Sequence, residues 1–439
     1  MSTRTEVKEA VKELLKTIHR GADPRELREK FRDILSKISP FEIPIIEQEL
    51  VGEGVPISEI LKLCDLHVEL FREVLMAREL QGVPRGHPLD ILLRENEWIA
   101  KQAEALGIFT QALARARSLE ERHNYMVAIR ALISELKKNR LHYRKIQMAI
   151  FPYLERRGII AVPRVMWSRE DQVIVKLRKV ATELEKISEN LEDEDVLKIS
   201  SELLELSREI NELVFRENKL LFPALWALLS EGEWVAIAEV SEKLGYIVKV
   251  EEREWKPSAK PIYPHELQDI VTREQIERLP PEFKSVVESR GLRPDTYIVK
   301  HEGDIELETG FLRPEEVEGI FRALPLEITY ADVNDRVRFF SESSLAGGFP
   351  RAKTIIGRNL LFCHPPRLEN YVKINVEALK RGDFKYREFW TRLGDRILRV
   401  IIARVEDRKG RLLGILEIVE DMTNIINNPE EIKKKIVVL

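Results

Sequence analysis

Two similar segments, RKIQMAIFPYL at residues 144–154 and RENKLLFPAL at 216–225, decide the fold of the central part of this chain. Each contains an apolar residue, Phe-Pro, one further residue and Leu, and each follows a long stretch with apolar residues at helical spacing. Long helices joined by short connections are typical of an up-down bundle. We therefore predict four long helices, at about residues 87–106, 110–152, 169–189 and 194–230.

The two segments also carry the remains of a common chemical pattern. When their Phe-Pro pairs are aligned, Ile146 lies opposite Glu217, and His142 lies opposite Leu213. A His and a Glu four residues apart share one helix face, and facing pairs of this kind hold two metal ions in carboxylate-bridged bundles. Each copy here keeps one half of the pair, and His87 at the start of the bundle offers a further imidazole.

This incomplete pattern has two interpretations. A single His on a mostly apolar helix is more often a packed residue than a metal ligand, and Ile146 in a carboxylate position favours a bundle kept for packing. The alternative is iron or another divalent metal held by His87, His142 and Glu217.

Composition narrows the class of protein. The chain has 439 residues, enough for two or three domains, and its 44% hydrophobic content is sufficient for large cores. Its 71 basic and 75 acidic residues give a net charge of −4, which argues against a dedicated nucleic-acid binder. Charged residues reach 33%, a bias found in thermophilic proteins.

Targeting signals and cysteines are also informative. No run of about 18 apolar residues is present, so we expect no membrane-spanning helix. The first residues lack the apolar region of a signal peptide. With only Cys64 and Cys363, a disulfide framework and a cysteine-rich metal site are excluded, and we expect a cytoplasmic protein.

After Leu324-Pro325 the apolar pattern changes to the period of two that is typical of strands. Two strands are predicted around Asn334-Asp335, then a helix at 368–382, then three strands with turns at Gly394-Asp395 and 407–410. This order predicts an α+β domain with an antiparallel sheet.

Cys363-His364-Pro365-Pro366 is the clearest polar cluster of this second region. A Cys and a His beside a pocket are able to ligate haem or another metal, whereas the proline pair equally indicates a simple turn. We find no kinase, phosphate-binding-loop, nucleophile-elbow or helix-turn-helix motif, so we expect no enzymatic activity.

These strings resemble one family, the domain-of-unknown-function-438 proteins. Such proteins join an N-terminal helical domain, a hemerythrin-like HHE cation-binding bundle and a C-terminal PAS domain. The resemblance is carried by EGVPISEILKLCDLHVELF (53–71), GHPLDILLREN (86–96), VPRVMW (162–167), RENKLLFP (216–223), GEWVAIAEVSEKLGY (232–246), LPLEITYADVNDRVRFFS (324–341), RAKTIIGRNLLFCHPP (351–366) and GILEIVEDMT (414–423).

The resemblance implies a metal site that this chain has partly lost. Three residues match the family's ligand pattern: His87, His142 and Glu217. Ile146 replaces an expected Glu, Leu213 replaces an expected His, and Glu170, which is able to bind a metal as a carboxylate, stands where the family tends to have His. The implied state is one weakly held metal or none.

The resemblance also implies the domain plan and a second site. A PAS domain has a five-stranded antiparallel sheet with helices over one face and a pocket between them. Candidate pocket residues are Cys363, His364, Phe340, Phe362 and Trp390, for haem or a small organic ligand. The expected segments are an N-terminal helical domain (1–80), the bundle (84–248), a linker with short helices (249–310), the PAS-like domain (311–425) and a tail (426–439).

Three functions remain open at this point. The first is a sensory or ligand-binding protein that signals through an unknown protein partner or as a homodimer. We expect a homodimer because strands 396–405 and 412–422 are long and apolar on both sides. One sheet face packs on the domain's own helices, and a second copy of the chain is a common cover for the other. The second is a non-haem iron protein that responds to oxygen or redox state, and the third is an interaction scaffold with vestigial sites.

Overall fold

The structure is a computed structural model that describes residues 49–56, 60, 72, 76, 80–187, 192–250, 254–267, 273–279, 284, 294–343 and 349–437. The chain divides into two compact units, Met1–Ile298 and Val299–Leu439, and each is treated by itself. Most of the helical domain expected at 1–80 lies outside the described residues, and so does Cys64. No helix in the described ranges has both the length and the apolar character needed to cross a membrane.

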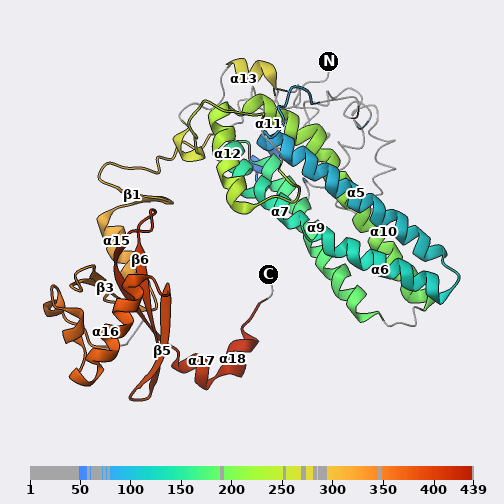
Figure 1. Cartoon of the computed structure of the whole chain (residues 1–439). Coiled ribbons are helices and arrows are strands. Elements are labelled where there is room, and N and C mark those ends of the chain that lie inside the picture. Colours follow the sequence, from blue (N-terminus) through green and yellow to red (C-terminus); the bar gives the residue numbers. More distant parts are fainter. Residues whose placement is uncertain are drawn as a thin grey trace. The chain divides into compact units, whose positions relative to one another are not determined.

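Four long helices form the bundle of the first unit (Figure 1). They are α5 (Pro88–Arg115), α6 (Leu119–Leu136), α9 (Ala161–Lys186) and α10 (Asp193–Arg216). Helices α5 and α9 each contact both α6 and α10, which closes the ring around one apolar core. The predicted bundle of long helices and the predicted fold class are therefore confirmed.

The first helix is longer than predicted, and the prediction of one helix over 110–152 is wrong. Gly107, in the gap between the first two predicted helices, lies inside α5, and a Cβ there would come within 3.1 Å of Ser207 Oγ. Ser207 on α10 donates a hydrogen bond to the Ala103 carbonyl at 2.6 Å. Gly107 therefore serves close packing of two helices, and the real turn lies at Ser118, whose side chain begins α6 through a capping box.

Both copies of the repeat contain a π-helical turn. Helix α7 (Asn139–Lys145) runs through a π-turn at Ile146–Ile150 into α8 (Phe151–Arg156). Helix α10 likewise runs through a π-turn at Glu217–Leu221 into α11 (Phe222–Leu228). The proline of each Phe-Pro pair has no backbone N–H to donate to the preceding turn, and a wider turn accommodates this loss.

The chain after the bundle closes one of its ends. Helix α12 (Glu231–Leu244) is followed by an extended segment, the short 3₁₀ helix Pro264–Glu266 and α13 (Arg273–Arg278). The Trp255 backbone N–H donates to the Arg85 carbonyl at 3.2 Å, and Tyr153 Oη donates to the Ile262 carbonyl at 2.8 Å. Part of the segment expected as a linker, residues 254–267, thus packs against the bundle.

The second unit is built on a five-stranded antiparallel sheet with the order β4-β3-β7-β6-β5. Its strands match the period-two predictions. Their bounds are β3 (Glu327–Asp332), β4 (Val337–Phe340), β5 (Tyr386–Leu393), β6 (Arg396–Glu406) and β7 (Leu412–Asp421). The other elements are β1 (Ile305–Leu307), β2 (Gly310–Leu312), α15 (Pro314–Ala323), two 3₁₀ turns (Lys353–Ile355 and Leu360–Cys363), α16 (Pro366–Arg381), α17 (Thr423–Asn427) and α18 (Pro429–Lys434).

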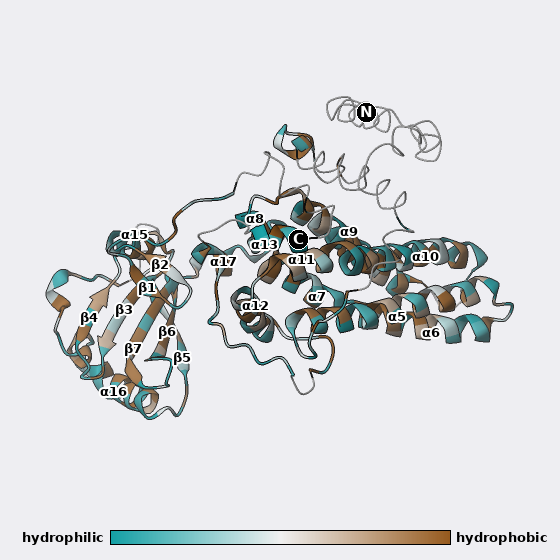
Figure 2. Ribbon diagram, turned by 90° about the horizontal axis from the view of Figure 1, so that it is seen from above, coloured by the Kyte–Doolittle hydropathy of each residue, from teal (hydrophilic) through white to brown (hydrophobic). Residues whose placement is uncertain are grey.

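The strand register divides the sheet into two faces. Ala331 pairs with Ile415, and both pack in one cluster with Leu379 of α16, so this is the helix-covered face. Ile418 pairs with both Ile328 and Ile401 on the opposite face, which we call the outer face. The central strands of this sheet carry many hydrophobic residues, as their colour in Figure 2 shows.

Candidate functional site

Four charged or ionisable side chains lie fully buried in the bundle, next to the two π-turns. His142 Nδ1 lies 2.7 Å from Glu95 Oε2, and His142 Nε2 lies 2.9 Å from Glu217 Oε2. Lys145 Nζ donates to Glu95 Oε1 and, at 3.0 Å, to the Gly245 carbonyl. We call these residues, Glu95, His142, Lys145 and Glu217, the ionic core.

Local structure explains how the four side chains meet. His142 and Lys145 are three residues apart on α7 and therefore share one helix face. Glu95 lies in the apolar stripe of α5, four residues after Ile91, and Glu217 is the first residue of the second π-turn. The ionic core thus joins the two copies of the repeat through α5.

Electrostatics favours the charged forms of His142 and Glu95 in the ionic core. Burial opposes protonation of His142, but the charges and hydrogen bonds of Glu217 and Glu95 prevail and raise its pKa to about 9. Burial would raise the pKa of Glu95, yet hydrogen bonds and charges from His142 and Lys145 hold it below its ordinary value. The pKa of Lys145 is lowered by burial, against the attraction of Glu95.

A third carboxyl group, Glu170 of α9, lies beside the ionic core in surroundings that favour its neutral form. Burial, followed by the charge of Glu217, raises its pKa well above the ordinary value. Its Oε2 accepts a hydrogen bond from Gln147 Nε2 at 2.6 Å. Within the described ranges, the Oε1 atoms of Glu170 and Glu217 have no hydrogen-bond partner, and neither has the buried Tyr143 hydroxyl.

These residues do not fit the two-metal centre that a hemerythrin-like bundle implies. Both nitrogens of His142 face carboxylates, and the Lys145 ammonium supplies positive charge where a metal would. Ile146 and Leu213 are buried and fill the positions of lost ligands with apolar volume. Across the part of the chain that the structure describes, no three His, Cys, Asp or Glu side chains form a group able to hold a metal ion.

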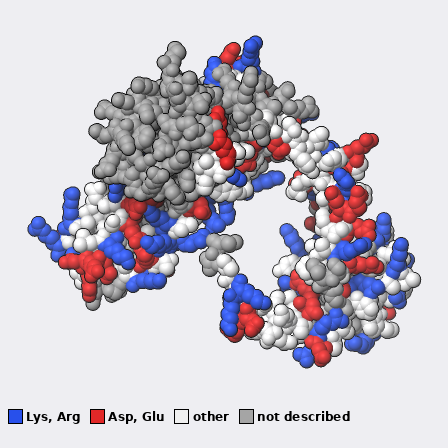
Figure 3. Space-filling model, turned by 180° about the vertical axis from the view of Figure 1, so that it is seen from behind, with Lys and Arg blue, Asp and Glu red and all other residues white. Residues whose placement is uncertain are grey.

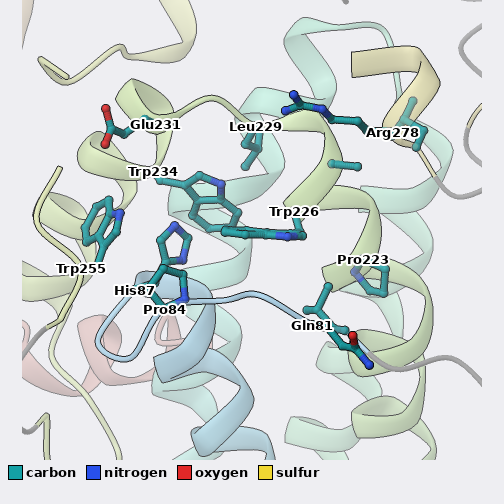
Figure 4. Close-up of a pocket in the computed structure, with 13 residues that line it drawn as sticks. Gln81, Pro84, His87, Pro223, Trp226, Leu229, Glu231, Trp234, Trp255 and Arg278 are labelled. Atoms are coloured by element: carbon teal, nitrogen blue, oxygen red, sulfur yellow. The ribbon is translucent and has the colours of Figure 1, made fainter. Parts of the chain in front are cut away.

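The structure separates His87 from the other predicted ligands. Its Nδ1 accepts a hydrogen bond from the Leu89 N–H at 3.1 Å and begins α5, and its ring lies among the side chains of Trp226, Trp234 and Trp255 (Figure 4). Of the predicted metal residues, His142, Glu217 and Glu170 come together, and His87 does not.

Sequence reasoning missed Glu95 and Lys145. Glu95 carried a usable signal, because it falls between Ile91 and Ile99 on the apolar stripe of its helix, where a charged residue needs a partner. The signal from Lys145 was weaker, because a lysine on an amphipathic helix normally extends its ammonium group into solvent and gives no reason to expect burial.

The second unit has a buried polar cluster on the helix-covered face of its sheet. Arg351 is paired with Glu327 and donates to Glu417 at 2.7 Å and to Thr329 Oγ1 at 2.7 Å. The two glutamates and Thr329 come from neighbouring strands, and Arg351 from the loop that precedes the 3₁₀ turns. The interior of this domain is therefore charged as well as apolar.

The five residues expected to line a pocket here are not brought together. Phe340 lies on the helix-covered face with Thr329, but Trp390 lies on the outer face, is 50% exposed and donates to Glu388 at 2.7 Å. Phe362 is 60% exposed, and Cys363 is also exposed. His364 Nδ1 donates to the Leu360 carbonyl at 3.0 Å, within the turn that the proline pair indicated.

Comparison with known families assigns three parts of the chain. Residues 11–77 match the family described as "Family of unknown function (DUF438)", residues 87–225 the "Hemerythrin HHE cation binding domain", and residues 317–423 a "PAS domain". These matches confirm the modules that the sequence predicted and their order.

Two solved structures resemble parts of the chain. A crystal structure of a C-terminal domain from Streptococcus mutans is 30% identical over 28% of this chain and 96% of its own, with a TM-score of 0.27. The sensor region of a sensor histidine kinase is 20% identical over 23% of this chain and 40% of its own, with a TM-score of 0.19. No curated protein sequence matches the chain.

Proposed function

We propose that this chain, which joins a DUF438 segment, a hemerythrin HHE bundle and a PAS domain, is a non-enzymatic sensory protein whose bundle works without a metal. Recognition belongs to the PAS domain, and the response passes to a protein partner or a second copy of the chain. The module order supports a sensory role, and the ionic core supports the absence of metal chemistry.

The ionic core is the observation that carries the proposal. The raised pKa of His142 and the lowered pKa of Glu95 favour their charged forms, and burial favours the neutral form of Glu170. The cationic partners His142 and Lys145 lie against the side chains of Glu95 and Glu217 where a metal would otherwise supply positive charge. A buried group with balanced charges has no electrostatic need for a divalent ion. A metal would also have to displace protons from His142 and Glu170, which lowers its apparent affinity.

The PAS domain supplies two surfaces for sensing. The helix-covered face, with Arg351 among Glu327, Glu417 and Thr329, is the place we assign to a small organic ligand. The outer face is only partly covered: Phe321 of α15 packs on Phe339 at 4.7 Å between ring centroids.

The rest of the outer face is where we place self-association. Ile401 and Ile418, in the middle of β6 and β7, remain half-buried. Apolar sheet faces of this kind are usually covered by a partner, and a two-fold homodimer is the commonest solution.

Surface charge is consistent with protein or small-molecule partners. On the face drawn in Figure 3, acidic and basic side chains are interspersed over both units. A nucleic-acid binder would present a continuous basic surface. We therefore propose no role for nucleic acid.

A second function is favoured by one observation. The unpartnered Oε1 atoms of Glu170 and Glu217 are the oxygen atoms that a single divalent ion would contact once Glu170 and His142 had lost their protons. A metal-dependent oxygen or redox response would then appear, and metal binding would strengthen as the pH rises.

Elemental analysis and native mass spectrometry of the freshly purified full chain test the proposal. Protein from iron-supplemented medium should retain no stoichiometric metal, and it should carry a small organic molecule or associate with itself or another protein. Stoichiometric iron, or a metal-free chain that shows neither ligand nor association, would contradict it.

A further inference from the structure

One end of the bundle contains a cavity of about 1000 Å³ that the proposed function does not use. Figure 4 shows that its walls come from the turn before α5, from α11 and α12, from the segment at Trp255 and from α13. This volume lies at the upper end of the range for ligand sites, and the lining is mainly apolar, as in sites for organic molecules.

Four aromatic rings form one wall of the cavity. The imidazole centroid of His87 lies 5.1 Å from the ring of Trp226 and 4.7 Å from that of Trp234. It lies 4.8 Å from the ring of Trp255, and all three contacts are edge-to-face. Because the hydrogen bond from Leu89 fixes the imidazole, the wall is organised before any ligand arrives.

Two side chains on this wall present hydrogen-bond donors. His87 accepts at Nδ1, so the neutral ring carries its hydrogen on Nε2, and burial keeps it neutral by lowering its pKa to about 4. Trp234 is 2% exposed, and its Nε1–H has no acceptor within the described residues. Figure 4 shows this nitrogen directed into the cavity, toward Leu229 and Arg278. A buried donor left without an acceptor is costly, and a ligand with acceptor atoms removes the cost.

The charged groups around the cavity also favour a ligand that carries hydrogen-bond acceptors. Arg278 lines it with a guanidinium group, although that group is also paired with Glu274. The carboxylate of Glu231 already accepts from the Ala259 N–H at 3.1 Å and from Ser258 Oγ at 3.3 Å. The Glu231 carboxylate is thus held by neutral donors of the segment after α12, whereas the Trp234 Nε1–H, the His87 Nε2–H and the Arg278 guanidinium are donors toward a ligand.

We propose that this cavity binds a planar aromatic carboxylate. The flat part of the ligand packs against the indole rings of Trp226 and Trp234, and its carboxylate accepts the Trp234 Nε1–H, with Arg278 at the edge of the site. Stacking and a charge-assisted hydrogen bond together give both affinity and selectivity.

Calorimetric titration of the full chain with three probes that share a naphthalene ring tests this proposal. The probes are 2-naphthoate, 2-naphthalenemethanol and 2-naphthylmethylammonium. The carboxylate should bind about tenfold or more tightly than the alcohol, the value of one charge-assisted hydrogen bond, and the ammonium should bind most weakly.

Two Trp→Phe variants locate the site. Trp234→Phe keeps an aromatic ring but removes the N–H, so it should abolish the preference for naphthoate over the alcohol and leave binding of the alcohol within about threefold. Trp167→Phe is the matched control, because Trp167 lies on α9 against Phe151, outside the cavity lining.

Three results would overturn the proposal. They are tightest binding of the ammonium probe, an unchanged preference for naphthoate in Trp234→Phe, and no binding of any probe to a wild-type chain that unfolds cooperatively. Metal content and self-association are not involved in these titrations, so the outcome is independent of the proposed function.

Discussion

Replacement of Lys145 by Met tests the energetics of the ionic core. The Lys145 side chain is 1% exposed, pairs with the fully buried Glu95, donates to the Gly245 carbonyl at 3.0 Å and lies 4.9 Å from the centre of the Tyr246 ring. Met keeps most of the volume but removes the charge and the hydrogen bonds to Glu95 and the Gly245 carbonyl, so Glu95 is left with one cationic partner fewer in a buried site. Removal of one partner of a buried ion pair costs about 3–5 kcal/mol. For a unit of this size, that lowers Tm by about 6–20 °C.

Urea unfolding of the full chain, followed by the circular dichroism of its helices, measures the decrease in the free energy of unfolding. Lys138→Met is the matched control, since Lys138 pairs with Glu135 at 2.6 Å where both side chains are about half exposed. That exposed pair should contribute less than about 1 kcal/mol. In the double variant Glu95→Gln with Lys145→Met, the loss should fall short of the sum of the single losses by at least about 1 kcal/mol. Equal losses for Lys145→Met and Lys138→Met, or strict additivity with Glu95→Gln, would refute the reasoning.

Three further predictions concern pH, packing and association. The pKa of His142 is raised from 6.5 to about 9, so protonation of His142 should add about 3 kcal/mol to the free energy of unfolding. This contribution is complete below pH 6.5 and is lost as the pH rises through 9. Urea unfolding below pH 6.5 and above pH 9 should show the difference in wild type and not in His142→Gln. Gly232→Ala should cost about 1–3 kcal/mol by calorimetry, because its Cβ would meet the Lys260 carbonyl oxygen at 2.7 Å, whereas Gly319→Ala, with nothing within 4 Å, should not destabilise. In sedimentation experiments, Ile418→Asp on the outer face should convert the dimer to monomer. Ile374→Asp, at an exposed position of α16, should leave the dimer unchanged.

Local patterns in the sequence predicted much of the fold. Period-two alternation located the five strands of the second unit, because a sheet with a buried face requires it. From the aligned repeat, His142 and Glu217 were predicted to belong to one site, and the structure places His142 Nε2 2.9 Å from Glu217 Oε2. The break predicted between residues 106 and 110 was wrong, because Gly107 lies inside α5, where the absence of a Cβ allows α10 to approach closely.

Contacts between distant segments were the part that sequence could not supply. Lys145 and Glu95 are 50 positions apart, and nothing on α7 alone distinguishes a buried lysine from a solvated one. His87 was assigned to the metal site because its residue type fits a ligand, whereas its position is set by a helix cap and by three tryptophans from later segments.

Nitrogen-15 NMR of the His142 imidazole tests most directly whether the bundle core balances its own charge. Comparison of wild-type and His142→Gln spectra assigns its signals among the eight histidines of the chain. The charge-balanced core predicts an imidazolium at pH 7.5, with both nitrogens protonated and a transition near pH 9. A neutral ring at pH 7.5, or nitrogen signals shifted or broadened by a bound metal, would contradict it.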